Sequence, residues 1–342
     1  MSAGWVAGSV RARALARRRI GADEARRLAA CGSLDEALAM LAGTPYRIGP
    51  GVPGGAPGQA RDGDVTNGRV ASGQVINGGG AVGGRGAREA LAATQHAIAE
   101  ALLWDLRVLA GWLPQGGAQL MRALAGWFEI ANVAERLAEL AGRQPGATFR
   151  LGALATAWPQ LRRADSLAEL RSVLAASAWK DPGGDTAEDL EVGMRSRWAQ
   201  RVAALGEPAQ TWAASALVLL LAGERFGAGR TANPVLRSVA ATLLGPRAAA
   251  ADTPDELARR LPGRLSWVLE SVADPADLWR AEVAWWVRTE RDGRELLAGS
   301  GLDKRPVLGA VVVLAADARR VGAALEIAAR GGGPIGVFDA VA

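Results

Sequence analysis

Two short stretches of the sequence contain residue types and spacings that could carry out chemistry. Ser177 and Lys180 in "SAWK" have the Ser-x-x-Lys spacing of serine acyltransferases. "GGGAVG", which begins at Gly78, formally matches the glycine fingerprint of dinucleotide-binding loops. The first stretch has no Ser-Asp-Asn or Lys-Thr-Gly partner motif, and only Val75 and Ile76 resemble a strand before the second. We therefore interpret neither stretch as a catalytic or cofactor site.

The side chains most used for metal binding and redox chemistry are scarce. The chain has one cysteine, Cys31, and one histidine, His96, too few for an internal disulfide or for a zinc site without carboxylates. Two acidic pairs, Asp35–Glu36 and Asp255–Glu256, could suggest acid–base chemistry. Each pair lies where a helix is expected to begin, however, and the helix dipole explains acidic residues there. We therefore expect no catalytic residue, no cofactor, no metal site and a reducing, cytoplasmic environment.

Composition favours a helical globular protein over a membrane-spanning one. The 342 residues are 49% hydrophobic and 22% charged, and Ala and Leu dominate over the β-branched and aromatic residues that favour strands. The longest apolar run, 212–222, would rise only about 16 Å as a helix, about half of a bilayer core, so we expect it to form a buried helix. We expect no signal peptide, because the N-terminus lacks a long apolar segment before a small-residue cleavage site.

The charge balance raises the alternative of a nucleic-acid-binding protein. The net charge is +5, the isoelectric point is near 10.4, and "SVRARALARRR" is strongly basic. Lysine occurs only as Lys180 and Lys304, however, and arginine and acidic residues are interspersed along the expected helices. This pattern indicates composition bias and solvated helix faces rather than one basic patch. We therefore expect no nucleic-acid partner.

The elements of the chain are organised around a repeated helix start. This helix start occurs three times, as "SLDEALAMLAGTPY", "SLAELRSVLAASAW" and "TPDELARRLPGRLS". In each copy a Ser or Thr is followed three residues later by Glu, the spacing of a capping box, and eight residues later by Leu. These residues are Ser33, Glu36 and Leu41, then Ser166, Glu169 and Leu174, then Thr253, Glu256 and Leu261.

Helical periodicity accounts for most of the remaining sequence, and no segment alternates as a strand would. We expect helices over 8–31, 88–112 and 117–141, and one continuous helix through the "VVV" of the last apolar segment. The stretch 49–86 is rich in glycine and predicts a flexible insertion. The sequence therefore predicts an all-α fold of three related helical modules, 1–145, 146–229 and 230–342.

Stretches spread over nearly the whole chain resemble the C/d family of V/A-type ATPase subunits. "RARALARRRIGADEARRLAACGSLDEALAMLAGTPY" is similar to that family's opening helices, which run to a Thr-x-Tyr, here Thr44 and Tyr46. "WFEIANVAERLAELAG" is similar to its Phe-Asp-Ile-x-Asn helix, with Glu129 in the acidic place and Asn132 at the asparagine. "RPVLGAVVVLAADARRVGAALEIAARGGGPIG" resembles its closing helix and glycine-rich tail.

The sequence also departs from the family pattern. Ala138 stands where the middle helix usually has an arginine. Arg320, Ala323 and Leu325 stand where the last helix usually has Glu, Asn and Arg. The glycine-rich stretch 49–86 is atypical as well. The resemblance is therefore to a divergent member of the family.

Members of this family form a three-lobed helical funnel with pseudo-threefold symmetry between the proteolipid rotor ring and the foot of the central stalk. The resemblance implies a non-catalytic protein that transmits torque in ATP-coupled proton or sodium transport. It implies proteolipid and central-stalk subunits as partners, and a location at the cytoplasmic face of the cell membrane, with membrane contact only through the ring. The residues that it places at partner interfaces are Tyr46, Glu129, Asn132, Arg319 and Arg320.

Other functions remain open at this point. A stand-alone helical scaffold or regulatory protein would need the same all-α fold without a rotary partner, and an enzyme of unrecognised class is a further alternative. The tryptophans are expected to be mostly core residues, but one group is dense enough to mark a binding surface. That group is Trp267, Trp279, Trp285 and Trp286.

Overall fold

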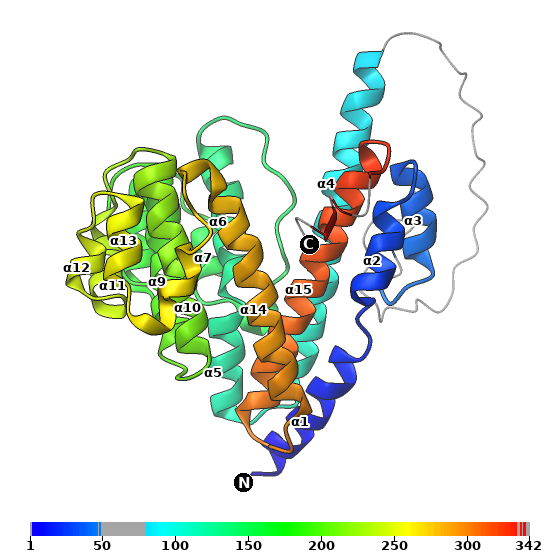
Figure 1. The fold of residues 1–342 in the computed structure, drawn as a ribbon, viewed down its shortest axis with the longest axis horizontal. Helices are drawn as coiled ribbons and strands as arrows, with labels where there is room; N and C mark the ends of the chain where they lie inside the picture. The colour runs from blue at the N-terminus through cyan, green and yellow to red at the C-terminus, as the bar shows by residue number, and fades with distance from the viewer. Residues whose placement is uncertain (1, 47, 49–79, 334–335, 337, 340–342) are drawn as a thin grey trace. The chain divides into compact units, whose positions relative to one another are not determined.

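The computed structural model describes residues 2–46, 48, 80–333, 336 and 338–339, with the side chains of 80–85 excepted. Within these residues all regular structure is helical and no strand occurs (Figure 1). The predicted all-α fold is therefore confirmed. The predicted insertion lies outside the described residues over 49–79, and a helix begins at Gly80.

The chain divides into two compact units, each built from segments that are distant in sequence. Unit 1 comprises Met1–Arg18 and Asp105–Ala316, and unit 2 comprises Arg19–Trp104 and Asp317–Ala340. The long helices α4 (Gly80–Gly111) and α15 (Lys304–Ala329) contribute residues to both units. Unit 2 is completed by α2 (Gly21–Ala29) and α3 (Leu34–Ala42).

Unit 1 contains most of the helices. In it, α9 packs against α6, α10 and α11, and the apolar run 212–222 lies in α10 with most of its side chains buried, as predicted. The bounds of its α-helices are α1 (Ala3–Ala16), α5 (Gln115–Leu124), α6 (Gly126–Leu140), α7 (Trp158–Leu161), α8 (Leu167–Ala176), α9 (Ala187–Ala203), α10 (Ala209–Ala222), α11 (Pro234–Leu243), α12 (Pro246–Ala249), α13 (Pro254–Arg260) and α14 (Leu278–Ala298). Short 3-10 segments occur at Gly152–Leu154, Gly263–Leu269 and Pro275–Asp277, and a π-helical turn at Gly223–Gly227.

The predicted helix bounds hold for the long apolar segments and fail at two breaks. The last apolar segment, including "VVV", is the single helix α15, as predicted. The expected helix over 8–31 is instead interrupted at 17–20, between α1 and α2. The expected helix over 117–141 is interrupted at Ala125, between α5 and α6. No proline occurs at either break, so the sequence gives no such signal for the end of a helix there.

The repeated helix start forms the same local structure three times. We call a short helix, its linker and the following capped helix a capped-helix unit; its copies are α2–α3, α7–α8 and α12–α13. In each copy the cap oxygen accepts the N–H group three residues later, at 3.2 Å. The glutamate at that position accepts the N–H group of the residue before the cap, at 2.7–2.8 Å. The three predicted capping boxes are therefore confirmed, with the glutamate reaching one residue further back than the usual pattern.

The linkers before the caps are also alike. In each copy the residue two positions before the cap donates its N–H group to the carbonyl of the residue five positions before the cap, at 3.2 Å. Both of these positions are buried and apolar in every copy. The residues are Cys31 and Leu28, then Ala164 and Leu161, then Ala251 and Ala248. The likeness of the three copies thus extends beyond the capping boxes. The three modules and their funnel arrangement stay a prediction.

Candidate functional site

The buried carboxylate of Glu129, on α6, organises the first group of predicted residues. Glu129 is only 1% exposed. Its oxygens accept hydrogen bonds from the backbone N–H groups of Thr156, at 2.7 Å, and of Ala157, at 2.5 Å. Ala157 caps the start of α7, where the first N–H groups have no partner within the helix. Glu129 therefore fixes the short helix of the second copy by a charge-assisted contact.

Asn132 lies on the same helix, almost one turn after Glu129, and is fully buried. Its Nδ2 donates to the carbonyl of Phe149 at 2.9 Å, and its Oδ1 accepts the N–H group of the same residue at 2.6 Å. One side chain thus pairs with both backbone groups of the same loop residue. Glu129 and Asn132 hold the connection between α6 and α7, and their assignment to a partner interface stays a prediction.

Trp179, the last residue of the second repeat, lies in the buried core that α6 forms with α7 and α8 in unit 1. It is 1% exposed, and its ring centre lies 4.5 Å from the guanidinium carbon of Arg201 on α9. Burial lowers the pKa of Arg201, and the Glu129 carboxylate opposes that shift. Within the described residues, neither Trp179 Nε1 nor Arg201 Nη1 has a hydrogen-bond partner, although both atoms are buried. We call Glu129, Asn132, Trp179 and Arg201 the Glu129 cluster.

A second buried carboxylate, Asp317 on α15, organises an equivalent group in unit 2. Asp317 is 1% exposed and accepts the N–H groups of Ile20, at 3.1 Å, and Gly21, at 2.8 Å, where α2 begins. The Tyr46 hydroxyl donates to the same carboxylate at 3.1 Å. Asp317 therefore fixes α2 as Glu129 fixes α7. Tyr46 closes the first repeat as Trp179 closes the second.

The two predicted arginines follow Asp317 on α15. Arg320 is 7% exposed, and its Nη1 lies 3.9 Å from Asp317 Oδ1, while Arg319 is half-buried. We call Tyr46, Asp317 and Arg320 the Asp317 cluster. The predicted interface residues therefore fall into two clusters, with Tyr46 and Arg320 in unit 2, and Glu129 and Asn132 in unit 1.

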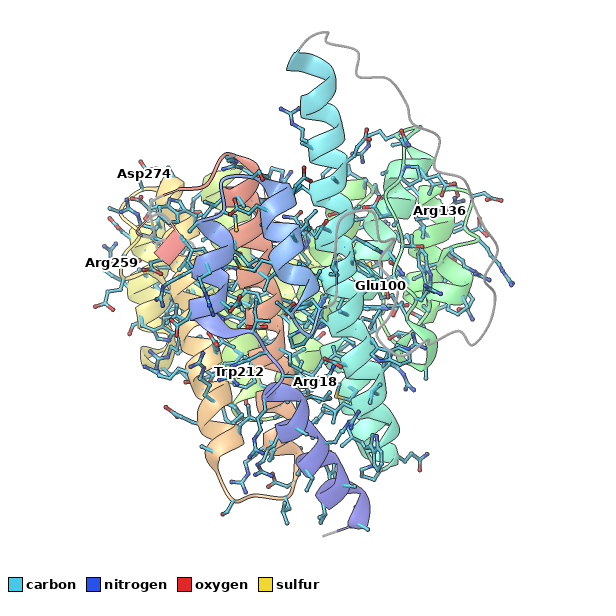
Figure 2. All side chains as sticks on the ribbon, turned by 90° about the vertical axis from the view of Figure 1, so that its right-hand side faces the viewer. Arg18, Glu100, Arg136, Trp212, Arg259 and Asp274 are labelled. Carbon is cyan, nitrogen blue, oxygen red and sulfur yellow. The ribbon has the colours of Figure 1, made fainter. Side chains whose placement is uncertain are left out.

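The third copy uses an arginine contact that it shares with the second. Arg136 on α6 (labelled in Figure 2) and Arg225, just after α10, each pair with the aspartate that precedes the cap, at 3.3 and 2.7 Å. Glu129 stands seven residues before Arg136, whereas Val218, which is buried, stands seven before Arg225. At the same sequence spacing from the arginine, the third copy therefore has an apolar side chain instead of a carboxylate.

The remaining candidates from the sequence are explained by local structure. Ser177 Oγ donates to the carbonyl of Leu174 and accepts the N–H group of Trp179, so it closes the end of α8. The thiol of Cys31 is buried and donates to the carbonyl of Arg27, and burial raises its pKa, which disfavours the reactive thiolate.

The side chains of the tryptophan group differ in their partners and in their exposure. Trp285 Nε1 donates to Ser215 Oγ at 2.8 Å and to the carbonyl of Trp212 at 3.2 Å, so its indole is tied to α10. Trp279, by contrast, is 45% exposed. Trp267 is half-buried and stacks on Arg288, with the guanidinium carbon 4.6 Å from the ring centre. The group therefore combines three half-buried tryptophans with one exposed tryptophan, Trp279.

The geometry of both clusters suits the holding of helix ends. The oxygens of Glu129 and Asp317 accept backbone N–H groups, and each carboxylate is closed off from solvent. In the part of the chain that the structure describes, no three His, Cys, Asp or Glu residues are grouped closely enough to hold a metal ion. No helix within the same residues combines the length and apolar character needed to cross a bilayer.

Sequence reasoning missed Asp317, Trp179 and Arg201. A signal for Asp317 was available, because it is an isolated acidic residue within the apolar run 307–318. A signal for Trp179 was its position, since Tyr46 and Trp179 both lie thirteen residues after their caps. Arg201 had no comparable signal, because it is one of many arginines on the helices.

Comparison with known proteins gives no further assignment. No protein family matches the sequence, and neither a curated protein nor a solved structure is similar enough to be matched with it.

Proposed function

We propose that this protein is a non-catalytic component of a V/A-type rotary ATPase that links the central stalk to the membrane rotor ring. In this role it transmits torque for ATP-coupled proton or sodium transport. The observation that carries the proposal is the capped-helix unit, which occurs three times with the same hydrogen bonds before and after the cap. Three related units can enclose a socket for a shaft, and the sequence resembles the family whose members do so.

The buried contacts support a mechanical role. A part that transmits torque has to resist deformation, and helix ends are the places where helices fray most easily. Here Glu129 and Asp317 each tie the start of a short helix to a long helix through two backbone N–H groups. These contacts stiffen the connections between helices without any exposed reactive group.

The partners in this proposal are proteolipid ring subunits and central-stalk subunits, and the location is the cytoplasmic face of the membrane, with contact through the ring. We assign Glu129 and Asn132 an indirect part, because they position the loop from Phe149 to Ala157 rather than reach a partner themselves. Tyr46 and Arg320 act in the same indirect way through Asp317.

The test is a tagged pull-down of the full chain from gently solubilised membranes, with bound proteins identified by mass spectrometry. The expected result is recovery of a proteolipid ring protein together with central-stalk proteins, and no recovery with the tag alone. A second readout is membrane vesicles from cells that lack the protein. They should lose ATP-driven ion transport, because the ring would no longer be connected to the stalk.

The negative outcome has to be interpreted with a control for the motor itself. The same membranes are assayed for rotary ATPase subunits before the pull-down. If those subunits are present and neither ring nor stalk proteins are recovered, the proposal is wrong. A stand-alone helical scaffold or regulatory protein would then be the better account of the fold.

A further inference from the structure

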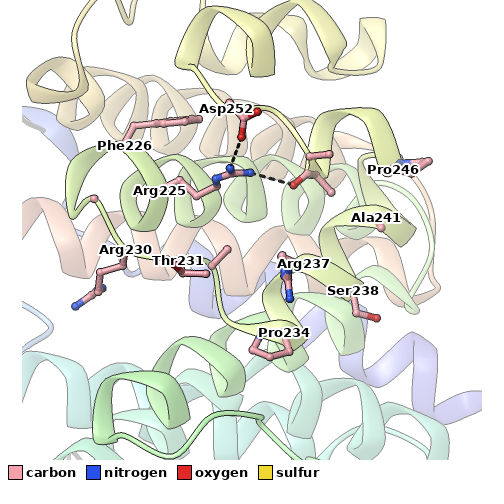
Figure 3. Close-up of a pocket in the computed structure, with 14 residues that line it drawn as sticks. Arg225, Phe226, Arg230, Thr231, Pro234, Arg237, Ser238, Ala241, Pro246 and Asp252 are labelled. Atoms are coloured by element: carbon pink, nitrogen blue, oxygen red, sulfur yellow. Dashed lines mark hydrogen bonds and ion pairs between the residues drawn. The ribbon is translucent and has the colours of Figure 1, made fainter.

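An open pocket lies beside the third capped-helix unit in unit 1. Its volume is about 710 Å³, within the range typical of small-molecule sites. It is bounded by the π-helical turn after α10, by α11 and by α12 (Figure 3). One part of the lining is apolar, and the rest carries arginine and hydroxyl side chains together with the carboxylate of Asp252, which is paired with Arg225. The apolar residues that line it include Phe226, Ala232, Pro234, Ala241 and Ala249.

Three arginines line this pocket, and two of them are neutralised. Arg225 pairs with Asp252 at 2.7 Å and also donates to the carbonyl of Ala249. Arg230 makes two hydrogen bonds to the carboxylate of Glu224, at 2.8 and 3.0 Å, which raise the pKa of Arg230. The guanidinium of Arg237 makes no hydrogen bond or ion pair with any other described residue.

Arg237 lies where a ligand could use its charge. It stands on α11 and lines the pocket, below Arg225 in the view of Figure 3. The hydroxyl side chains of Ser238 and Thr231 also line the pocket. The N-terminus of α11 is not the source of attraction, because Asn233 Oδ1 already accepts its first N–H groups, from Val235 and Leu236.

We propose that this pocket binds a small organic anion, with its carboxylate or phosphate group on Arg237 and its apolar part against the alanine and proline side chains. A planar guanidinium matches the oxygen atoms of either anionic group. Ser238 and Thr231 supply further donors beside it. The apolar wall near Ala241 and Ala249 accounts for the body of the ligand, so an inorganic ion alone would bind more weakly. This site is independent of any contact with a rotary motor.

The test is a titration of the full chain, labelled at alanine methyl groups, with phenyl phosphate and separately with phenylacetate. Binding should shift the methyl resonances of Ala241 and Ala249, which line the pocket. Benzyl alcohol, which lacks the anionic group, should shift them only weakly. Arg237→Gln should weaken binding of the anionic probe about tenfold, since it removes a charged hydrogen-bond donor, and Arg237→Lys should weaken it less.

The matched control is Arg259→Gln, which removes an exposed arginine from α13 outside the pocket (Figure 2) and should leave binding unchanged. Because Arg237 and Arg259 are both exposed, both variants should keep the thermal unfolding midpoint of the wild type. A response to only one of the two anionic probes would support the site and identify its head group. No shift with either probe at about 10 mM, or equal binding to wild type and Arg237→Gln, would overturn the proposal.

Discussion

The Glu129 and Asp317 clusters solve the same structural problem with segments of very different separation. Glu129 accepts N–H groups that lie 27 and 28 residues away, within one stretch of unit 1. Asp317 accepts N–H groups 297 and 296 residues away, so the two ends of the chain meet in unit 2. The second copy is therefore completed locally, whereas the first copy needs the C-terminal helix. The carboxylate can therefore come before or after the short helix in the sequence, provided that a longer helix brings it to the start of the short one.

The clusters also differ in how their aromatic residue is used. Tyr46 donates its hydroxyl to Asp317. Trp179 instead packs under Arg201 and leaves its own Nε1 without a partner in the described chain. The hydroxyl of Tyr46 thus stabilises the first copy, whereas the unpaired Nε1 of Trp179 destabilises the second. This difference, together with the carboxylates themselves, can be tested by substitution.

The largest effect is expected for Glu129→Ala. The change removes the acceptor for two buried N–H groups and leaves the half-buried charge of Arg201 without its nearby carboxylate. We expect a loss of about 3–5 kcal/mol in the free energy of unfolding, measured by denaturant titration. Glu139→Ala, on the exposed side of the same helix, is the control and should lose less than about 1 kcal/mol. Equal losses in the two variants would contradict the role given to Glu129.

Asp317→Ala should have the next largest effect, about 2–4 kcal/mol, because it removes the acceptor for Ile20, Gly21 and Tyr46. The sharper readout is where protection is lost. Amide hydrogen exchange should accelerate at Ile20 and Gly21 and stay unchanged at Thr156 and Ala157. Faster exchange at both pairs would mean that the two copies do not depend on separate carboxylates. Asp317→Asn, which keeps one acceptor oxygen, should fall between the wild type and the alanine variant.

The sequence predicted the capping boxes of the three copies, which are local contacts. It missed the contacts that each buried carboxylate makes with a distant segment. Capping boxes are local: Ser33 and Glu36 are three residues apart, so their contact follows from the spacing alone. The contact between Asp317 and Gly21 depends on the path of the whole chain, and no local pattern specifies it. The break between α5 and α6 at Ala125 was missed for a related reason. Alanine is a strong helix former, but Gly126 beside it is a weak one and packs closely against the rings of Trp198 and Trp179, so the boundary depends on partners distant in sequence.

The third-copy residue Val218 shows why the resemblance could not place the site completely. It stands where the spacing from Arg225 would put a carboxylate, and a buried valine needs no polar partner. The arginine contact before the cap survives in that copy, while the carboxylate contact does not. Pattern matching assigned Glu129 and Asn132 to a partner interface, which stays a prediction, and their burial and their internal partners became evident only from the fold.

The two aromatic residues give a smaller and more discriminating pair of effects. Tyr46→Phe should lose about 1 kcal/mol, because it deletes one hydrogen bond to a buried carboxylate. Trp179→Phe should change stability by less than about 1 kcal/mol, since removing an unsatisfied buried donor offsets the lost packing. Trp179→Ala is the control for packing and should lose about 3–5 kcal/mol. A larger loss for Trp179→Phe than for Tyr46→Phe would show that Trp179 Nε1 has a partner in solution.

The smallest effect concerns Asp105, a carboxylate of unit 1 that contrasts with both clusters. No hydrogen bond from a described N–H group reaches it, and burial raises its pKa, which the nearby charges of Arg18 and Arg11 only partly oppose. A carboxylate whose pKa is raised in the folded state binds a proton more tightly there than in the unfolded chain. Its contribution therefore falls as the pH rises from the unfolded pKa to the folded one, and stays unfavourable above that window.

Asp105→Asn should accordingly stabilise the protein at pH 7, by less than about 1 kcal/mol after solvent screening. The gain should shrink as the pH is lowered through the window between the two pKa values, because the aspartate is then protonated and resembles the amide. Denaturant titrations of both proteins from neutral to acidic pH measure this difference directly. A destabilised variant at pH 7, or a gain that grows toward acid, would mean that Arg11 and Arg18 stabilise the charged carboxylate more than burial disfavours it. Asp105 would then belong with Glu129 and Asp317 as a third carboxylate held by specific partners.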